Sequence, residues 1–280
     1  MIHSPILPVP GLGSVVPSPL VVPRPAATVL LVRDHPHPPS GRAPLQVFLQ
    51  RRVAGMAFAS GMTVFPGGGV DAGDRFEAAS WAGPSPEWWS ERLGCDTELA
   101  GALVNAAVRE TFEECGVLLA GPSLPPELDR HRADLVARRS NLGQVLGGNG
   151  LVLRSDLLRA WARWITPPPS PKRYDTYFFV ALLPEGQEAD AHTTEAVEAS
   201  WWFPAEALEQ WWSGDVQLMP PTIRTLQEIA EHPDSASVLA ATADRDLAPI
   251  IPQVRREGGR PVAVLPGDPD IEIALPGGGA

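Results

Sequence analysis

The amino-acid sequence predicts a fold of the α/β or α+β class, a sandwich of helices and strands with no obvious second domain. Three observations lead to this prediction. Residues 26–32 form a short apolar, β-branched run that is typical of a buried strand, and residues 174–183 form the clearest strand pattern in the chain. Helical patterns come late, at residues 220–230 and 235–243. At 280 residues, the chain is long enough to bury a substantial core.

The other expected elements follow from local patterns of apolar residues, prolines and glycines. We expect strands at residues 45–51, 62–65 and 196–203, a strong helix at 102–114, mostly helical structure over 122–165, and a short helix opening at Pro204. A proline-rich arm precedes them at residues 1–24. The last forty residues are weakly patterned apart from residues 261–265.

The charge balance argues against a nucleic-acid-binding surface. With 22 basic and 33 acidic residues the net charge is −11, whereas nucleic-acid binding needs a basic face. An anionic substrate is still compatible with this balance if metal ions or a few placed arginines neutralise it locally. No apolar run approaches the ~18 residues of a membrane span, and no convincing signal peptide is present. We therefore expect a cytoplasmic protein with reduced thiols at Cys95 and Cys115; its oligomeric state stays open, with a homodimer as one alternative.

Three carboxylates share one face of the helix expected at 102–114. Glu110, Glu113 and Glu114 stand at i, i+3 and i+4, so they project within one sector of about 100°. Like charges at this spacing destabilise an isolated helix, but a hard cation such as Mg²⁺, bound by carboxylate oxygens, reverses that effect. Arg109 precedes Glu113 by four residues and can orient it by a charge-assisted hydrogen bond. From spacing alone, a solvated acidic helix edge is the more common alternative. The opposite face is expected to enter the core through Val104, Val108, Phe112 and Cys115.

A glycine-rich loop precedes this helix and directly follows an expected strand. It contains Gly67, Gly68 and Gly69 and continues to Asp74. Backbone without side chains can approach a ligand closely and can offer a carbonyl oxygen to a metal. The loop therefore favours a metal site over a solvated helix edge.

Together the loop and the helix resemble the Nudix box, in which Gly, five residues, Glu and seven residues precede Arg-Glu-U-x-Glu-Glu-x-Gly-U, where U is aliphatic. Gly68 takes the position of the box glycine, and residues 109–117 match the second half except for Thr111 at an aliphatic position. The resemblance implies a Nudix-type α/β/α sandwich with a mixed sheet and additional C-terminal helices. It places this domain at residues 25–252, with an insertion at about 75–101 and a tail at 253–280.

The match departs from the box at two points. The first box glutamate falls on Asp74, a shorter carboxylate, and the seven-residue spacer is stretched to the 34 residues from Arg75 to Val108. Glu98, which lies inside that spacer, is an alternative for the same role. The sequence leaves the choice between Asp74 and Glu98 open.

The segment before the glycine loop resembles the corresponding signature of coenzyme A diphosphatases. Arg52, Gly61 and residues 65–68 match it, whereas a second arginine of the signature falls on Ala57. The long spacer and residues 173–179 and 219–222 are similar to one branch, the eukaryotic peroxisomal acyl-CoA diphosphatases and their bacterial relatives. This resemblance implies a small-molecule substrate, coenzyme A or acyl-CoA, hydrolysed to a phosphopantetheine and 3′,5′-ADP.

The resemblance also implies a metal centre. Glu110, Glu113 and Glu114 would hold one to three Mg²⁺ or Mn²⁺ ions, with the Gly68 carbonyl completing a shell. Bound metal would offset the charge of the diphosphate and lower the pKa of a bound water. Together with Arg109, these glutamates form the expected catalytic helix.

Residues outside the helix complete the expected site. A further carboxylate is implied as base or extra ligand, and Glu195 and Glu198 are the candidates, with Glu198 preferred. Arg52 and Arg173 are candidates for gripping phosphates as planar, always charged donors. Gly67 is expected, with Gly68, to line the substrate site. For each of these residues a surface or packing role is the alternative.

Two other functions remain compatible with the sequence. One is the same chemistry on ADP-ribose, a nucleotide sugar or an oxidised nucleotide, which the residue Ala57 keeps open. The other is a nucleotide-sensing module without catalysis, which Asp74 and the insertion allow. The three glutamates argue against the sensor, because a module that only binds has no need of mutually repelling carboxylates.

Overall fold

The computed structural model describes residues 21–53, 61–75, 81–168, 170–191, 196–257, 260–265 and 268–274. Several sequence predictions fall outside these ranges. They are residues 1–20 of the proline-rich arm, Ala57 and Glu195.

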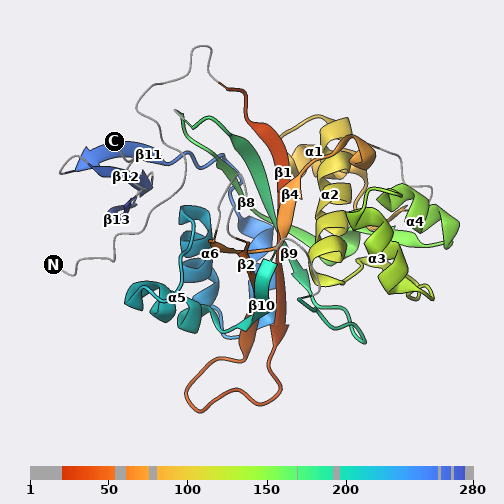
Figure 1. Ribbon diagram of the computed structural model, residues 1–280, viewed down its shortest axis with the longest axis horizontal. Coiled ribbons are helices and arrows are strands. Elements are labelled where there is room, and N and C mark those ends of the chain that lie inside the picture. Colours follow the sequence, from red (N-terminus) through yellow and green to blue (C-terminus); the bar gives the residue numbers. More distant parts are fainter. Residues whose placement is uncertain are drawn as a thin grey trace.

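A mixed sheet forms the middle layer of the molecule (Figure 1). Its strands are β1 (Arg24–Asp34), β2 (Leu45–Arg52), β3 (Thr63–Val64), β4 (Gly67–Gly69), β8 (Leu158–Ile165), β9 (Tyr174–Leu182) and β10 (Ala196–Trp202). The strand order is β10–β2–β1–β9–β8, with β3 beside β2 and β4 beside β1. The long strand β1 pairs in parallel with β9 and antiparallel with β2 and β4, so it holds the two halves of the sheet together.

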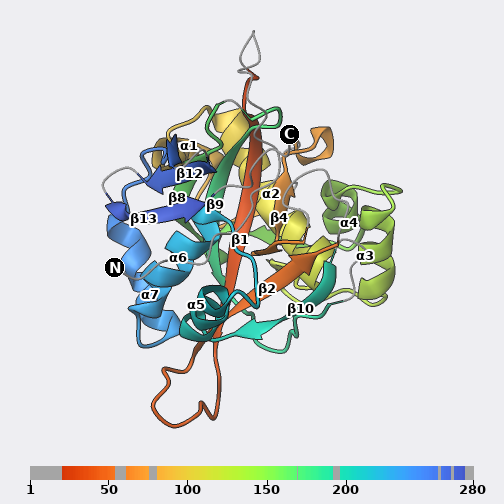
Figure 2. The ribbon, with the colours of Figure 1, turned by 60° about the vertical axis from the view of Figure 1, so that its left-hand side comes forward.

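Helices cover both faces of this sheet (Figures 1 and 2). On one face lie α1 (Pro86–Leu93), α2 (Thr97–Cys115), α3 (Leu128–Val136) and α4 (Leu142–Gly148); on the other lie α5 (Pro204–Ser213), α6 (Pro220–Ala230) and α7 (Ser235–Ala241). Because side chains alternate along a strand, β1 sends Val29 and Leu31 into the core under α2, and Leu30 and Val32 into the core under α6. The expected α/β/α sandwich with a mixed sheet is confirmed.

Three short 3₁₀ helices and two small sheets complete the described chain. The 3₁₀ helices are η1 (Ala72–Asp74), η2 (Ser155–Leu157) and η3 (Thr242–Asp244). One small sheet joins β5 (Trp81–Ala82), β7 (Val152–Arg154) and β6 (Ala120–Gly121), and the other joins β11 (Gln253–Glu257), β12 (Arg260–Leu265) and β13 (Asp268–Ala274). The weakly patterned tail therefore forms three antiparallel strands, because pairing between consecutive strands uses backbone groups and needs no strong apolar pattern.

The expectation of mostly helical structure over 122–165 is confirmed for α3 and α4 and is wrong for residues 152–165. There β7 and β8 are strands, and β8 pairs antiparallel with β9 along its length. Leu158, Ala160 and Trp164 are buried. A bulge between Ala160 and Ala162 interrupts the two-residue period and conceals the strand pattern in the sequence.

Other predicted elements lie within a few residues of their observed positions. Helix α6 has the predicted bounds, and β9 and β10 each end one residue earlier than predicted. Strand β1 begins at Arg24, the last residue of the predicted arm. Among the described residues, no helix is long and apolar enough to cross a membrane.

The insertion within the predicted box packs onto the core. Ser85 caps α1 by accepting a hydrogen bond from the Trp88 backbone N–H, and Gly94 ends it in a left-handed conformation. Trp89 is fully buried, with its ring centroid 5.7 Å from that of Phe179 on β9. The insertion is therefore an integral part of this face of the sandwich.

We expect Trp89→Ala to lower the free energy of unfolding by about 3–5 kcal/mol, because it leaves a large cavity between α1 and the sheet. The neighbouring Trp88, 46% exposed, is the matched control, and Trp88→Ala should change stability by less than about 1 kcal/mol. Urea unfolding of the two variants measures the difference. Equal losses in both variants would show that α1 is not anchored through Trp89.

Candidate active site

Helix α2 carries the predicted acidic face. It starts at Thr97, earlier than predicted, because the Asp96 carboxylate caps it by accepting a hydrogen bond from the Leu99 N–H (2.7 Å). It ends at Gly116, which adopts a left-handed conformation (φ 74°). The four residues predicted for the core face are fully buried, namely Val104, Val108, Phe112 and Cys115. The helix therefore turns its glutamates toward the glycine loop.

The glycine loop lies directly against α2. Its strand β4 pairs with residues 26–28 of β1, which holds the loop at the edge of the helix. A β-carbon at Gly67 would overlap the Ala27 carbonyl oxygen, and one at Gly68 would overlap the carboxylate of Glu110. Bare backbone is therefore required at Gly67, whereas a side chain at Gly68 would force the Glu110 carboxylate to move. The sequence predicted that the backbone of this loop approaches a ligand closely. The structure shows that the backbone at Gly68 closely approaches the Glu110 carboxylate.

Arg109 connects the loop to the acidic face. Its guanidinium donates to both carboxylate oxygens of Asp74 (2.8 and 3.0 Å) and to the backbone oxygen of Gly69 (3.0 Å). It also lies 2.8 Å from a carboxylate oxygen of Glu110 and donates to Glu113 at 3.1 Å. The side chain is only 9% exposed. The predicted orientation of Glu113 by Arg109 is confirmed, and Glu110 is held by the same group.

Asp74, rather than Glu98, occupies the position beside this arginine. Asp74 is fully buried; one carboxylate oxygen also accepts a hydrogen bond from the Asp71 N–H (2.8 Å), and its backbone oxygen accepts one from Asn105 (2.8 Å). The Glu98 side chain is 72% exposed and pairs with Arg75 at the surface. The spacing of five residues between Gly68 and Asp74 was thus the informative signal.

Glu114 is held by strand β2 and by the loop. It accepts hydrogen bonds from Gln50 Nε2 (2.5 Å) and from the Gly67 N–H (2.6 Å), and it is 4% exposed. No sequence motif marks Gln50 as a site residue. One signal was available. Gln50 follows Phe48 by two residues on the same strand, and Phe48 packs into the core under α2, so the Gln50 side chain faces α2 as well. The other side-chain oxygen of Gln50, Oε1, is buried without a hydrogen-bond partner among the described residues.

Burial makes the carboxylates of Glu110 and Glu113 hard to ionise. Burial raises the pKa of Glu110 well above its ordinary value; Arg109 opposes this shift, whereas Glu114 and Glu113 add to it. Burial likewise raises the pKa of Glu113, again against the effect of Arg109. A cation placed among these groups would favour their ionised forms. Burial also raises the pKa of the Cys115 thiol, which suits an inert packing residue.

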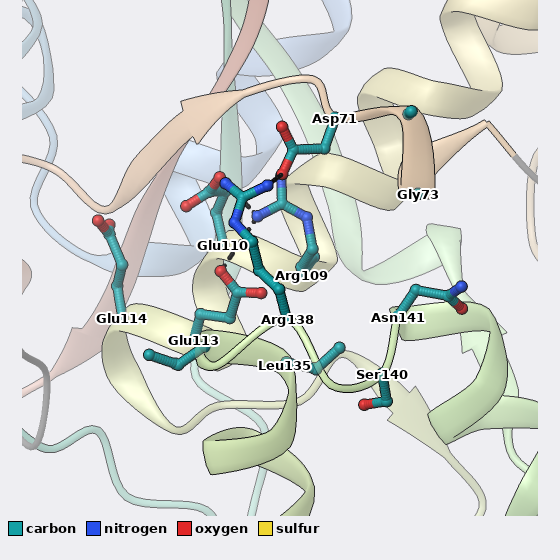
Figure 3. Close-up of a pocket in the computed structure, with 12 residues that line it drawn as sticks. Asp71, Gly73, Arg109, Glu110, Glu113, Glu114, Leu135, Arg138, Ser140 and Asn141 are labelled. Atoms are coloured by element: carbon teal, nitrogen blue, oxygen red, sulfur yellow. Dashed lines mark hydrogen bonds and ion pairs between the residues drawn. The ribbon is translucent and has the colours of Figure 1, made fainter.

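A cleft of about 390 Å³ opens over the acidic face (Figure 3). Arg109 and the three glutamates form one side of it, and the loop after β4 and the link between α3 and α4 form the others. The remaining lining residues are Asp71, Ala72, Gly73, Leu135, Val136, Arg138, Ser140 and Asn141. Asp71, Ala72 and Gly73 belong to the predicted glycine loop, whereas no motif marks the other five residues in the sequence. They reach the cleft only because α3 and η1 pack against α2 and α4 packs against η1.

The structure does not bring Glu198 to the acidic face. Glu198 lies on β10 opposite Arg51, 3.6 Å from its guanidinium, and is 63% exposed. Its neighbour Ala199 and the paired residue Gln50 face α2, so Glu198 and Arg51 face the other side of the sheet. Glu195, the other candidate for the extra carboxylate, is outside the described residues.

The two arginines predicted to grip phosphates lie in different places. Arg173 donates to the backbone oxygens of Thr166 (2.8 Å) and Val21 (2.9 Å), so it joins the β8–β9 connection to the chain entering β1 and is not among the cleft residues. Arg52 ends β2, two residues after Gln50 and therefore on the same strand face. Its position is compatible with the predicted role, whereas that of Arg173 is not.

The donor set suits a hard cation, although its oxygens do not converge on one point. Glu110 and Glu113 turn to Arg109 (Figure 3), whereas Glu114 turns to Gln50 and Gly67. Within the described ranges, no three His, Cys, Asp or Glu side chains are already grouped for a metal ion. The chemistry still fits Mg²⁺ or Mn²⁺, because buried carboxylates and the unpaired Oε1 of Gln50 are oxygen ligands.

Comparison with known proteins shows which family this chain resembles. The model of the NUDT19 Nudix domain matches residues 94–229, which include α2 and its glutamates. A Nudix hydrolase of known structure from Alicyclobacillus acidocaldarius is 27% identical and superposes with a TM-score of 0.62, over 78% of this chain and 96% of that one. The chain therefore resembles the Nudix hydrolases, both over the matched domain and in its fold.

Curated relatives indicate the branch within that family. Human acyl-coenzyme A diphosphatase NUDT19 is 28% identical over 82% of this chain and 74% of its own length. Putative nudix hydrolase 7 of Caenorhabditis elegans is also 28% identical, over 68% of this chain but only 57% of its own length. The chain therefore resembles the NUDT19 branch.

We expect Asp74→Ala to lower the free energy of unfolding by about 3–5 kcal/mol, because Arg109 would stay buried without its main partner. Glu98→Ala, which removes the exposed alternative, should cost less than about 1 kcal/mol. Chemical denaturation of both variants measures these values. A larger loss for Glu98→Ala would contradict the assignment of Asp74.

The raised pKa of Glu110 predicts how its replacement affects stability at different pH values. In the unfolded chain, Glu110 ionises near pH 4.3, whereas in the folded chain it retains its proton to higher pH. The contribution of Glu110 to the free energy of unfolding of the wild type therefore falls as the pH rises above about 4. Glu110→Gln removes this loss. In metal-free buffer, the stability of Glu110→Gln relative to wild type should therefore rise between pH 4 and pH 7, as measured by denaturant titration. A constant or falling difference would contradict the pKa shift.

Proposed function

We propose that this enzyme is a metal-dependent diphosphatase that hydrolyses coenzyme A or acyl-CoA to (acyl-)phosphopantetheine and 3′,5′-ADP. The observation that carries the proposal is the acidic face of α2, which lies beneath a glycine loop and forms one side of a cleft. The similarity to human acyl-coenzyme A diphosphatase supports the choice of substrate. The net charge of −11 is compatible with an anionic substrate only if positive charge is supplied locally.

Glu110, Glu113 and Glu114 are the residues that would hold Mg²⁺ or Mn²⁺, with the Gly68 backbone beside them. When bound, the metal would offset the negative charge of the diphosphate and lower the pKa of a bound water. The unpaired Oε1 of Gln50 is a polar atom that a water of the metal could satisfy.

The surrounding residues position these ligands. Arg109 restrains Glu110 and Glu113 from one side, and Asp74 restrains Arg109 in turn. Gln50 and the Gly67 N–H hold Glu114. Positioning residues of this kind lower the reorganisation that the ligands need before reaction. Arg52, at the end of β2, remains our candidate for contacting a phosphate.

We expect Glu114→Gln to abolish Mg²⁺-dependent turnover, with kcat falling about 100-fold or more, because the neutral amide is a poor metal ligand and metals supply several kcal/mol of charge stabilisation. Glu98→Gln, an exposed change on the same helix, should leave kcat within about twofold. Mass spectrometry of the products measures both rates. Unchanged turnover in Glu114→Gln would remove the proposal.

A substrate panel decides between the alternatives. With Mg²⁺ and with Mn²⁺, we would compare coenzyme A, acyl-CoA, ADP-ribose, a nucleotide sugar and an oxidised nucleotide by kcat/KM. Preference for coenzyme A or its acyl form supports the proposed substrate. Preference for another diphosphate would retain the chemistry and reject that substrate, and tight binding without any turnover would indicate a sensing module.

A further inference from the structure

One helix of the cleft ends in an unusual way. At the end of α3, the Arg138 N–H donates to the Leu135 oxygen and the Arg139 N–H donates to the Asp134 oxygen, both at 2.8 Å. These two bonds define a Schellman motif. Arg138 occupies the position of this motif at which glycine is usual. Arg138 has φ 56°, in the left-handed region.

Glycine occupies the left-handed position at the ends of other helices in this protein. Gly94, Gly116 and Gly214 end α1, α2 and α5 with φ between 65° and 86°. A residue with a β-carbon is disfavoured in this conformation, whereas glycine is not. A non-glycine residue held there by its surroundings is a reason to look for a function of the side chain.

The Arg138 side chain faces the active-site cleft. It is a lining residue of that cleft, and Figure 3 shows it reaching over the acidic face toward Asp71. Its guanidinium lies 3.1 Å from the Asp71 carboxylate, and the side chain is 81% exposed. The left-handed turn thus places an exposed positive charge at the opening of the cleft.

Arg138 is available to a ligand in a way that Arg109 is not. Among the described residues that line the cleft, Arg109 and Arg138 are the two that carry positive charge. The negative charges of the lining belong to the carboxylates of Asp71, Glu110, Glu113 and Glu114. Arg109 is buried, and its donors are already engaged by Asp74, Gly69 and the neighbouring glutamates. Arg138 is exposed, and the ion pair that holds it is also near the surface, since the Asp71 side chain is 43% exposed.

We propose that Arg138 binds a phosphate group of the substrate, and that Asp71 holds the guanidinium in place while the cleft is empty. The inference rests on the proposed diphosphatase function. A guanidinium offers a planar pair of N–H donors that matches two phosphate oxygens. An exposed ion pair contributes little to stability, so a phosphate group, with its strong acceptor oxygens, can displace Asp71.

The test compares Arg138 with the arginine beside it. Arg138→Ala removes the proposed contact, Arg138→Lys retains a charge without the planar pair of donors, and Arg138→Gly also relieves the left-handed backbone. Arg139→Ala is the matched control, because Arg139 pairs with Asp134 at 2.7 Å and is not among the cleft residues. Each variant is assayed with Mg²⁺ on coenzyme A and on its analogue that lacks the 3′-phosphate.

We expect Arg138→Ala to raise KM about tenfold with little change in kcat, as for the loss of one charged hydrogen-bonded contact. Arg138→Lys should recover part of that loss, and Arg139→Ala should behave as wild type. Arg138→Gly should melt at a higher temperature than wild type, because glycine suits the left-handed position, and yet show the raised KM. This combination separates binding from a merely structural role.

The two substrates locate the bound phosphate. A KM increase with coenzyme A alone assigns Arg138 to the 3′-phosphate, and an increase with both substrates assigns it to the diphosphate; either result supports the inference. Unchanged KM in Arg138→Ala, in an enzyme whose wild type turns over these substrates, would overturn the inference alone. Absence of wild-type turnover on every diphosphate of the panel would overturn the proposed function and this inference with it.

Discussion

The site depends on the buried ion pair between Asp74 and Arg109. Removing two charges from water is costly, and the pair is tolerated only because further hydrogen bonds satisfy both groups. Asp74 also accepts from the Asp71 N–H, and Arg109 also contacts Gly69, Glu110 and Glu113. One interaction thus ties the end of the glycine loop to the middle of α2, and it sets the direction of two of the three glutamates. Without this ion pair, the end of the loop would no longer be tied to α2 at Arg109.

The acidic face lowers the stability of the fold. Burial raises the pKa values of Glu110 and Glu113, which means that the folded protein holds their charges less readily than water does. The apolar face of the same helix offsets this, since Val104, Val108 and Phe112 are fully buried. A long helix with two unlike faces therefore lets a strained group of like charges exist inside a stable protein.

Sequence patterns predicted the elements whose signal is local. The acidic face of α2 has a period of three to four residues, and β9 ends in an apolar run from Tyr177 to Leu182, so both were found. Strand β8 was missed because a bulge at Ala160–Ala162 breaks its alternation. Gln50 and Arg138 were missed for another reason. Each acquires its place in the site only through packing between segments far apart in the sequence, and no local pattern records such packing. Glu198 had a suitable local position but faces the other side of the sheet.

The 34-residue spacer between Asp74 and Arg109 has a consequence for how this family of sites can change. Closing a loop loses chain entropy only as the logarithm of its length, so extending seven residues to 34 weakens closure by only about 1.4 kcal/mol. The hydrogen-bonded pair at its two ends, together with the buried Trp89 inside it, is sufficient to offset that loss. The pairing of Asp74 with Arg109 therefore does not depend on an interval of seven residues. Residues can be added between the loop and α2, as α1 is here, provided that they pack onto the core.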